Sequence, residues 1–178
     1  QVSNSVQQEQ KLFDLIADQI DNIEQFYFAG GEPLLMPEHW QILDMLVEHK
    51  RFDVKVSYNT NASTLMYGKK NVLDYWRLWD DWKVEVWPSI DEIDERAEII
   101  RSGTVWSKVE DNLKEMTKLD NIVVRPGLTI GAWNVNRLPE IINRLVEIGV
   151  VRKKHKFQNF FINLLFDPTH YHMHILPD

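Results

Sequence analysis

The chain has 178 residues, of which 44% are hydrophobic and 26% are charged, and this is the composition of a globular protein rather than a disordered or membrane one. Its formal net charge of −7 argues against a general nucleic-acid binder, because such proteins are usually basic. The sequence contains no cysteine, which excludes disulfides, thiol nucleophiles and any iron–sulfur cluster held by thiolates of this chain.

The length predicts one domain over residues 1–178. The longest apolar run, at 160–166, is too short to cross a bilayer, and no secretory signal is visible at the start. We therefore expect a cytoplasmic protein that has no membrane or nucleic-acid partner. The chain begins with Gln1 rather than methionine, so we expect either that other residues precede it or that the gene model is incomplete.

The first half of the chain alternates between helix and strand patterns. The predicted elements are a helix at 6–22, a strand at 25–29, a helix at 37–49, a strand at 52–59, a helix at 70–80 and a strand at 84–90. Pro37 suits the first turn of its helix. Pro88 cannot donate a backbone hydrogen bond, so we expect the ladder of the third strand to stop or bulge there.

The second half continues the alternation. It contains predicted helices at 92–101 and 105–118, a strand at 121–130 that is interrupted at Pro126-Gly127, a helix at 137–148 and a strand at 157–166, and we expect the last dozen residues to be irregular. Thr104 and Asn136 are expected to cap helices, and Gly103 and Gly149 to end them. Five strands joined by helices predict an α/β fold with parallel strands, either a barrel segment or an open sheet.

Distinct motifs stand where the predicted strands end, and in parallel α/β folds the chemistry lies at the carboxyl ends of the strands. They are AGGEP at 29–33, NTNAS at 59–63, PSID at 88–91, GLTIGAWN at 127–134 and DP at 167–168. In the first motif, Gly30 and Gly31 allow the backbone to approach a ligand, and Glu32 adds a carboxylate. This combination suits the ammonium end of an amino acid, although a simple tight turn before Pro33 explains it equally well.

These motifs together resemble the radical S-adenosylmethionine enzymes. FYFAGGEPLL is similar to the second strand and GGEP motif of that family, NTNAS to its third strand end, and VWPSID to its fourth. The stretch 95–119, the segment VRPGLTIGAWNVNRLPEIINRLVEIGV and NLLFDP are similar to the regions that follow, in the same order. The resemblance covers about residues 10–168 and is greatest to members with a C-terminal twitch or SPASM extension.

The resemblance implies a partial (βα) barrel, like a TIM barrel, that holds S-adenosylmethionine across the strand tops. It also implies a 4Fe–4S cluster, held in the family by a CxxxCxxC loop after the first strand. Five of the six strands are matched here, while the first strand, the cluster loop and the extension after the tail 168–178 are not. We therefore expect a truncated core whose parent protein holds the cluster and which is inactive by itself, with no catalytic residue in this chain.

The resemblance assigns ligand contacts to eight residues. Gly30, Gly31 and Glu32 would meet the methionyl ammonium, and Ser89 and Asp91 would meet the ribose or nearby polar groups. For Ser89 and Asp91 the alternative is that they cap the helix 92–101. The family often has glycine after this aspartate, whereas this chain has Glu92.

The remaining three residues are Arg101, Asn59 and Asn61. Arg101 could pair with the ligand carboxylate, or with Glu98 or Asp94 in a purely structural pair. Asn59 and Asn61 could line the pocket, or could serve the turn that follows the strand.

Two other hypotheses compete with the enzyme core. The lack of cysteine is compatible with a cluster-free homologue that acts as a binding or interaction module. An unrelated barrel enzyme could use Glu32 and Asp91 as acid and base, but the sequence shows no convincing pair for this. Without the family's first strand, QFYFA at 25–29 would form an exposed apolar sheet edge, so we expect self-association as a homodimer, or residues 1–5 covering the edge as a strand.

Three further features favour structural roles. HYHMH at 170–174 would place three imidazoles on one face of an extended segment and could bind zinc or nickel, but a solvated tail is the preferred interpretation. RKKHK at 152–156 is expected to be a solvated loop. We expect four of the seven tryptophans (Trp40, Trp76, Trp79, Trp106) to lie in the core and Trp133 to line a cleft.

Overall fold

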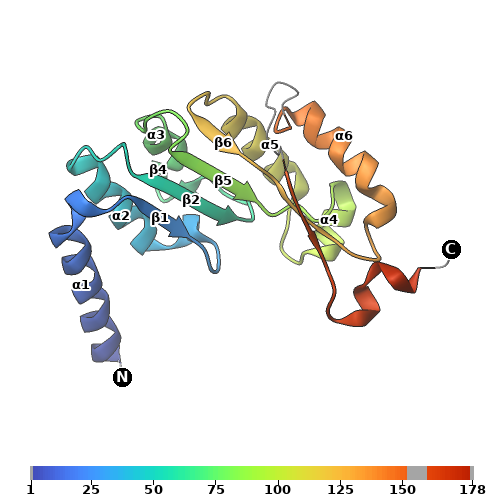
Figure 1. Cartoon of the computed structure of the whole chain (residues 1–178), viewed down its shortest axis with the longest axis horizontal. Coiled ribbons are helices and arrows are strands. Elements are labelled where there is room, and N and C mark those ends of the chain that lie inside the picture. Colours follow the sequence, from blue (N-terminus) through green and yellow to red (C-terminus); the bar gives the residue numbers. More distant parts are fainter. Residues whose placement is uncertain (1, 152–159, 177–178) are drawn as a thin grey trace.

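The computed structural model describes residues 2–151 and 160–176 (Figure 1). The α-helices are α1 (Val2–Asp18), α2 (Pro37–Glu48), α3 (Val72–Trp76), α4 (Asp94–Ile100), α5 (Trp106–Thr117) and α6 (Leu138–Ile148). The strands are β1 (Gln25–Phe28), β2 (Lys55–Thr60), β3 (Met66–Tyr67), β4 (Lys70–Asn71), β5 (Val84–Pro88), β6 (Ile122–Val124), β7 (Gly127–Ile130) and β8 (Phe161–Leu164). Short 3-10 helices are η1 (Ile20–Asn22), η2 (Pro33–Leu35), η3 (Val135–Arg137), η4 (Thr169–Tyr171) and η5 (Met173–Ile175).

The main sheet is parallel and open. Its strand order is β1-β2-β5-β6, and β7 and β8 form a second parallel pair that continues from it through a bridge between Ser89 and Gly127. Figure 1 shows α3, α5 and α6 along one side of the twisted sheet. The predicted α/β fold with parallel strands is therefore confirmed, in the form of a partial barrel that does not close.

The predicted break in the fourth strand is also confirmed. Arg125 still donates its backbone N–H to Val86 of β5, at 2.8 Å, but Pro126 has no N–H to give. Instead, the carbonyl of Pro126 accepts from Phe161 of β8, at 2.9 Å. The chain therefore leaves the main sheet at β6 and, as β7, begins a new pair with β8. Pro88 similarly ends β5, as expected.

The two faces of the sheet differ because side chains alternate along each strand. Val56, Tyr58, Val84 and Val86 are completely buried on the face that the helices cover. Trp40, Trp76, Trp79 and Trp106 belong to the same core, with exposed fractions of 0–6%, as predicted from helix spacing. The residues between them in sequence, such as Ser57, Glu85 and Trp87, lie on the opposite face and line a hollow described below.

The N-terminal region differs from prediction. The first helix spans Val2–Asp18 and is followed by the 3-10 turn η1, rather than spanning 6–22. Residues 2–5 lie in this helix, so the idea that residues 1–5 add a strand to the sheet is wrong. Within the described residues β1 is an edge strand, as expected.

Most other differences between the predicted and observed elements arise from local turns and helix caps. The helix expected at 70–80 is only α3, because β3 and β4 form an unpredicted hairpin and Asn71 then caps α3 by accepting from the backbone N–H of Leu73, at 3.0 Å.

Thr104 and Asn136 do not cap their helices. Glu98 accepts from the N–H of Trp106 at the start of α5, and Asn136 lies within η3. Gly149 ends α6 with a φ of +90°, as predicted.

The C-terminal segment is irregular, as expected, but it is not extended at the histidines. Two 3-10 turns place the Nδ1 atoms of His172 and His174 2.7 Å apart, while the ring of His170 packs against Tyr171. Within residues 2–151 and 160–176, no three histidine, aspartate or glutamate side chains are placed to hold a metal ion.

RKKHK, expected to be a solvated loop, lies outside the described residues. No helix in the described part of the chain is long and apolar enough to cross a membrane.

Candidate functional site

The glycine turn after β1 presents open backbone. Gly30 has a φ of +116°, a conformation that residues with a Cβ rarely adopt, and no atom lies within 4 Å of where a Cβ of Gly30 or Gly31 would stand. Both glycines are exposed. The loop that follows is anchored in the core, because the indole Nε1 of Trp40 donates to the carbonyl of Leu34, at 3.0 Å.

Glu32 joins the end of β1 to the end of β2. Its Oε1 atom accepts from the hydroxyl of Thr60 at 2.7 Å and from the backbone N–H of Leu34 at 3.3 Å, and its Oε2 atom accepts from the N–H of Asn61 at 2.8 Å. Thr60 is 2% exposed, so the carboxylate is held by a rigid strand end. An ionised carboxylate has about four acceptor positions, and these contacts use three of them.

The two asparagines at the end of β2, Asn59 within it and Asn61 just after it, have different roles. Asn61 forms the turn expected as the alternative to a ligand contact, since its Oδ1 atom accepts from the N–H of Ser63, at 2.8 Å. Asn59 does not serve that turn. Its side-chain amide donates to the hydroxyl of Tyr27 on the neighbouring β1, at 2.6 Å.

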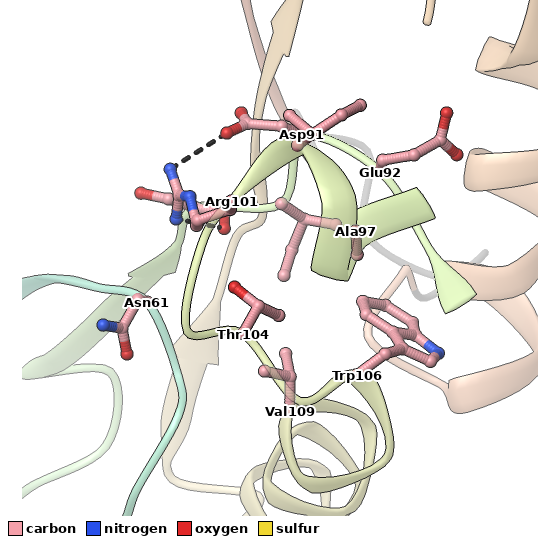
Figure 2. Close-up of a pocket in the computed structure, with 11 residues that line it drawn as sticks. Asn61, Asp91, Glu92, Ala97, Arg101, Thr104, Trp106 and Val109 are labelled. Carbon is pink, nitrogen blue, oxygen red and sulfur yellow. Dashed lines mark hydrogen bonds and ion pairs between the residues drawn. The ribbon is translucent and has the colours of Figure 1, made fainter. Parts of the chain in front are cut away.

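Asp91 and Arg101 form an ion pair beyond the end of β5 (Figure 2). The Nη2 atom of Arg101 lies 2.9 Å from Oδ2 of Asp91, and its Nη1 atom donates to the backbone carbonyl of Ser89, at 3.0 Å. The other oxygen of Asp91 accepts from the N–H of Thr129, at 3.3 Å. These contacts correct two of the alternatives: Arg101 does not pair with Glu98 or Asp94, and neither Ser89 nor Asp91 caps α4.

The side chain of Asn134 stabilises the turn that contains Asp91 through hydrogen bonds. It is completely buried, and its side-chain amide donates to the carbonyls of Asp91, at 2.6 Å, and Thr129, at 2.8 Å. Its Oδ1 atom accepts from the N–H of Gly131, at 2.9 Å. Asn134 therefore ties the turn after β7 to the turn after β5. Trp133 packs edge-on against Tyr171 and lines neither of the two cavities described below, so its place in a cleft stays a prediction.

Four predicted site residues surround one small cavity of about 20 Å³ (Figure 2), which has room for about one water molecule. They are Asn61, Ser89, Asp91 and Arg101. A larger cavity of about 470 Å³, here called the sheet hollow, lies along the open face of the sheet, and Asn59 and Ser89 are among its lining residues. Ser89 therefore borders both cavities, whereas Gly30, Gly31 and Glu32 line neither.

The sheet hollow contains polar residues that were not predicted as site residues. Ser57 is 5% exposed, and its hydroxyl has no hydrogen-bond partner among the described residues; the same is true of the buried Nε1 atom of Trp87. Lys55 and Glu85 pair across the strands, at 3.0 Å. The alternation of residues in KVSYN and VEVWP could have predicted these polar residues on the open face, because every second residue of both segments must face away from the apolar core.

The chain does not fit an iron–sulfur cluster. Such clusters need cysteine thiolates or, at some positions, histidine, and this sequence has no cysteine. The donor set near the strand ends does fit S-adenosylmethionine, since it combines free backbone at Gly30 and Gly31 with the carboxylates of Glu32 and Asp91, which retain acceptor capacity.

Solved structures share this fold. The chain matches SuiB from Streptococcus suis bound to the precursor peptide SuiA with a TM-score of 0.63 and 16% identity, over 92% of this chain and 34% of that chain. It matches SuiB bound to S-adenosylmethionine with a TM-score of 0.59 and 16% identity, over 83% and 31%. Native anSMEcpe with bound AdoMet and Cp18Cys peptide matches with a TM-score of 0.54 and 19% identity, over 78% and 37%.

These neighbours are radical S-adenosylmethionine enzymes, and the chain spans about a third of their length. At 16–19% identity the likeness shows the fold, so the partial barrel implied by the sequence resemblance is confirmed. No family model and no curated protein matches the sequence.

Proposed function

We propose that this chain is the S-adenosylmethionine-binding core of a radical S-adenosylmethionine protein. The observation that carries the proposal is that side-chain contacts hold the polar groups at the ends of β1, β2 and β5 in place. Glu32 bonds the turn after β1 to the end of β2, and Arg101 bonds Asp91 to the carbonyl of Ser89 beyond β5. Solved neighbours of this fold include enzymes with bound S-adenosylmethionine.

The proposed contacts follow from the unused hydrogen-bonding capacity. Glu32 retains about one acceptor position for the ammonium of the ligand, beside the exposed backbone of Gly30 and Gly31. Asp91 retains about two, which suit a ribose diol, with Ser89 adjacent. Arg101 already holds Asp91, so its role in the proposal is to position that carboxylate. Asn59 and Asn61 would border the ligand from β2.

Radical chemistry would need a 4Fe–4S cluster, and any such cluster would need thiolates from outside this chain. We therefore expect the chain by itself to bind S-adenosylmethionine without cleaving it. The lack of cysteine is equally compatible with the second candidate, a cluster-free binding module. The acid–base hypothesis is less well supported, because no hydrogen bond joins Glu32 to Asp91 in the described residues and each is held by other donors.

Isothermal titration calorimetry with S-adenosylmethionine tests the shared part of both candidates. Glu32→Ala should weaken binding at least about tenfold, since it removes a charge-assisted contact, whereas Glu48→Ala on exposed α2 surface serves as the matched control. Equal affinity in the wild type and Glu32→Ala, or no binding at all by folded protein, would overturn the proposal.

The coding DNA upstream of Gln1 separates the two candidates. An in-frame CxxxCxxC segment shortly before Gln1 would favour the radical enzyme. A stop codon followed by a start site close to Gln1 would favour the cluster-free module.

A further inference from the structure

Glu92 is a buried carboxylate next to the proposed ligand site, at the position where the resembling family often has glycine. It follows Asp91 directly, and its side chain is completely buried. Figure 2 shows the two side chains pointing away from each other, Asp91 towards Arg101 and Glu92 towards the opposite side of the turn. A carboxylate taken out of water is costly unless it is paired, so the partners of Glu92 show what holds it there.

The main partner of Glu92 is Arg137 at the end of η3. The Nε atom of Arg137 lies 3.1 Å from Oε1 and 3.1 Å from Oε2 of Glu92. The Oε1 atom also accepts from the backbone N–H of Ile93, at 3.2 Å, and Nε of Arg96 lies 3.9 Å from Oε2. The guanidinium of Arg137 also pairs with the exposed Glu140, at 3.0 Å. The buried ion pair therefore joins the turn after β5 to η3.

One short segment, 134–137, holds the backbone on both sides of the peptide bond between Asp91 and Glu92. Asn134 donates to the carbonyl of Asp91, at 2.6 Å, and Arg137 donates to the carboxylate of Glu92. The direction in which the carboxylate of Asp91 points depends on this backbone. Arg137 itself lines neither of the two cavities, so any effect on a ligand must pass through Glu92.

Stability alone does not account for a buried ion pair. Replacing such a pair by apolar side chains of similar size is often neutral or stabilising, because the desolvation of both charges offsets their attraction. Removing one partner is strongly unfavourable, because it leaves an uncompensated buried charge. The paired arrangement of Glu92 and Arg137 is therefore strongly preferred over others, and its contribution is a fixed geometry of the turn.

We propose that Glu92 is a positioning residue: its ion pair with Arg137 holds the carboxylate of Asp91 in the orientation that binds the ribose diol of S-adenosylmethionine. The inference rests on the proposed function for the identity of the ligand. It goes beyond that function because it makes the affinity depend on η3, whose residues line neither cavity.

The free protein reports the orientation of Asp91 without any ligand, because the backbone N–H of Thr129 donates to Asp91, at 3.3 Å. We expect the double variant Glu92→Met/Arg137→Met to shift the amide resonance of Thr129 and to speed its hydrogen exchange beyond any change in global stability. Glu140→Gln is the matched control, since it removes only the exposed partner of the same arginine. An unchanged Thr129 signal in the double variant would overturn the proposal.

Calorimetry with S-adenosylmethionine then separates positioning from folding. The double variant should bind at least about tenfold more weakly, while its resistance to urea equals or exceeds that of the wild type. A merely structural role predicts wild-type affinity in the folded double variant, and that result would contradict the proposal.

A mutant cycle with Asp91→Ala tests whether Glu92 acts through Asp91. Glu92→Gln alone should weaken binding by about threefold or more, but in the Asp91→Ala background it should change the affinity by less than about twofold. Equal effects in the two backgrounds would show that Glu92 does not act through Asp91. This cycle also decides the question if the double variant does not fold.

The two proposals fail in different ways. Equal affinity of the wild type and the folded double variant for S-adenosylmethionine would refute this inference and leave the proposed function standing. Absence of binding by the folded wild type would refute the proposed function and, with it, the assignment of the ribose. The Thr129 signal would then still decide whether Glu92 positions Asp91.

Discussion

Arg101 holds Asp91 in place: their side chains lie 2.9 Å apart, and the same guanidinium donates to the carbonyl of Ser89. Three residues that the sequence placed at a ligand site are therefore one connected unit at the end of β5. The side chain of Arg101 is 39% exposed, so the ion pair itself contributes little to stability. Its contribution is to orient the carboxylate of Asp91.

The first prediction concerns Arg101→Met. We expect its free energy of unfolding to fall by no more than about 1 kcal/mol, because the pair is partly solvated, while the affinity for S-adenosylmethionine falls about tenfold. Arg77→Met is the matched control, since Arg77 forms an exposed pair with Asp74, at 2.7 Å. Calorimetry and urea unfolding measure the two quantities. Wild-type affinity in Arg101→Met would contradict a positioning role for Arg101.

The second prediction concerns Glu32→Gln, which keeps the shape of the side chain but removes its charge. One oxygen can still accept from Thr60, but the new amide cannot accept from the N–H of Asn61, so we expect a loss of about 1–3 kcal/mol in the free energy of unfolding. Urea unfolding of Glu32→Gln beside Glu32→Ala measures this. If neither variant loses stability, the hydrogen bonds of Glu32 between the ends of β1 and β2 do not stabilise the protein.

The strand ends could be predicted because their residues follow local rules. The glycine turn at 30–31, the break at Pro126 and the left-handed residue at Gly149 all depend on backbone preferences that single residues carry. The alternation of strands and helices likewise predicted the parallel sheet. These features needed no knowledge of long-range contacts.

The remaining features depend on contacts that sequence spacing does not reveal. The structural alternative for Arg101 was a pair with a residue three or seven positions away, but its partner lies ten positions back, on the other side of α4. Thr104 is a good capping residue by type, yet Glu98 from α4 caps α5 instead. The three hydrogen bonds that connect Asn134 to the turns after β5 and β7 could not be predicted from the sequence either, because they form only when those strands lie side by side.

The third prediction is a pH dependence that His39 creates. His39 is 2% exposed beside Phe28, Trp40 and Tyr58, and burial lowers its pKa from 6.5 to about 3. Its Nε2 atom lies 3.2 Å from the hydroxyl of Tyr58, whose own pKa burial raises, so both groups stay neutral near pH 7. The unfolded chain therefore binds a proton at His39 between pH 6.5 and pH 3 that the folded chain does not bind.

The sign follows from this difference in bound protons. The contribution of this group to stability is fully present above pH 6.5 and falls as the pH decreases towards 3, by on the order of 5 kcal/mol. Urea unfolding at several pH values, for wild type and His39→Gln, measures it. The variant is expected to be less stable at pH 7 but to lose less stability on acidification. Parallel curves for the two proteins would exclude His39 as the cause.

The fourth prediction concerns Glu110, which connects α5 to α6. Burial raises its pKa, but hydrogen bonds from Lys114 and Arg144 outweigh this and lower it below the usual value. The carboxylate also accepts from the indole of Trp106, at 3.0 Å. Its stabilising effect is therefore present above about pH 4.5 and is lost as the pH falls below that value.

Truncation of Glu110 should cost more than truncation of its partners. Glu110→Ala leaves the indole of Trp106 without its acceptor and leaves Arg144 with Glu147 as its remaining partner among the described residues, and we expect a loss of about 2–4 kcal/mol. Lys114→Met should cost less than about 1 kcal/mol, since the lysine side chain is 48% exposed. Thermal or urea unfolding ranks the two. Equal losses would mean that the carboxylate is solvated in solution.

The last prediction concerns self-association through β1. β1 is an edge strand of its sheet in the described residues, and Tyr27 within it is 59% exposed. The backbone of Glu24 accepts from Lys55 of β2, so by the alternation of a parallel ladder Gln25 and Tyr27 direct their backbone groups away from the sheet. Such an unpaired edge can bind the edge of a second copy of the chain.

We therefore expect a dimer at high protein concentration in sedimentation velocity experiments. Gln25→Pro should shift the protein towards monomer, because proline removes the outward N–H without breaking a hydrogen bond to β2. Gln25→Ala keeps that N–H and should associate as the wild type does. A wild-type monomer at all concentrations, or equal association of the proline and alanine variants, would show that this edge does not mediate dimerisation.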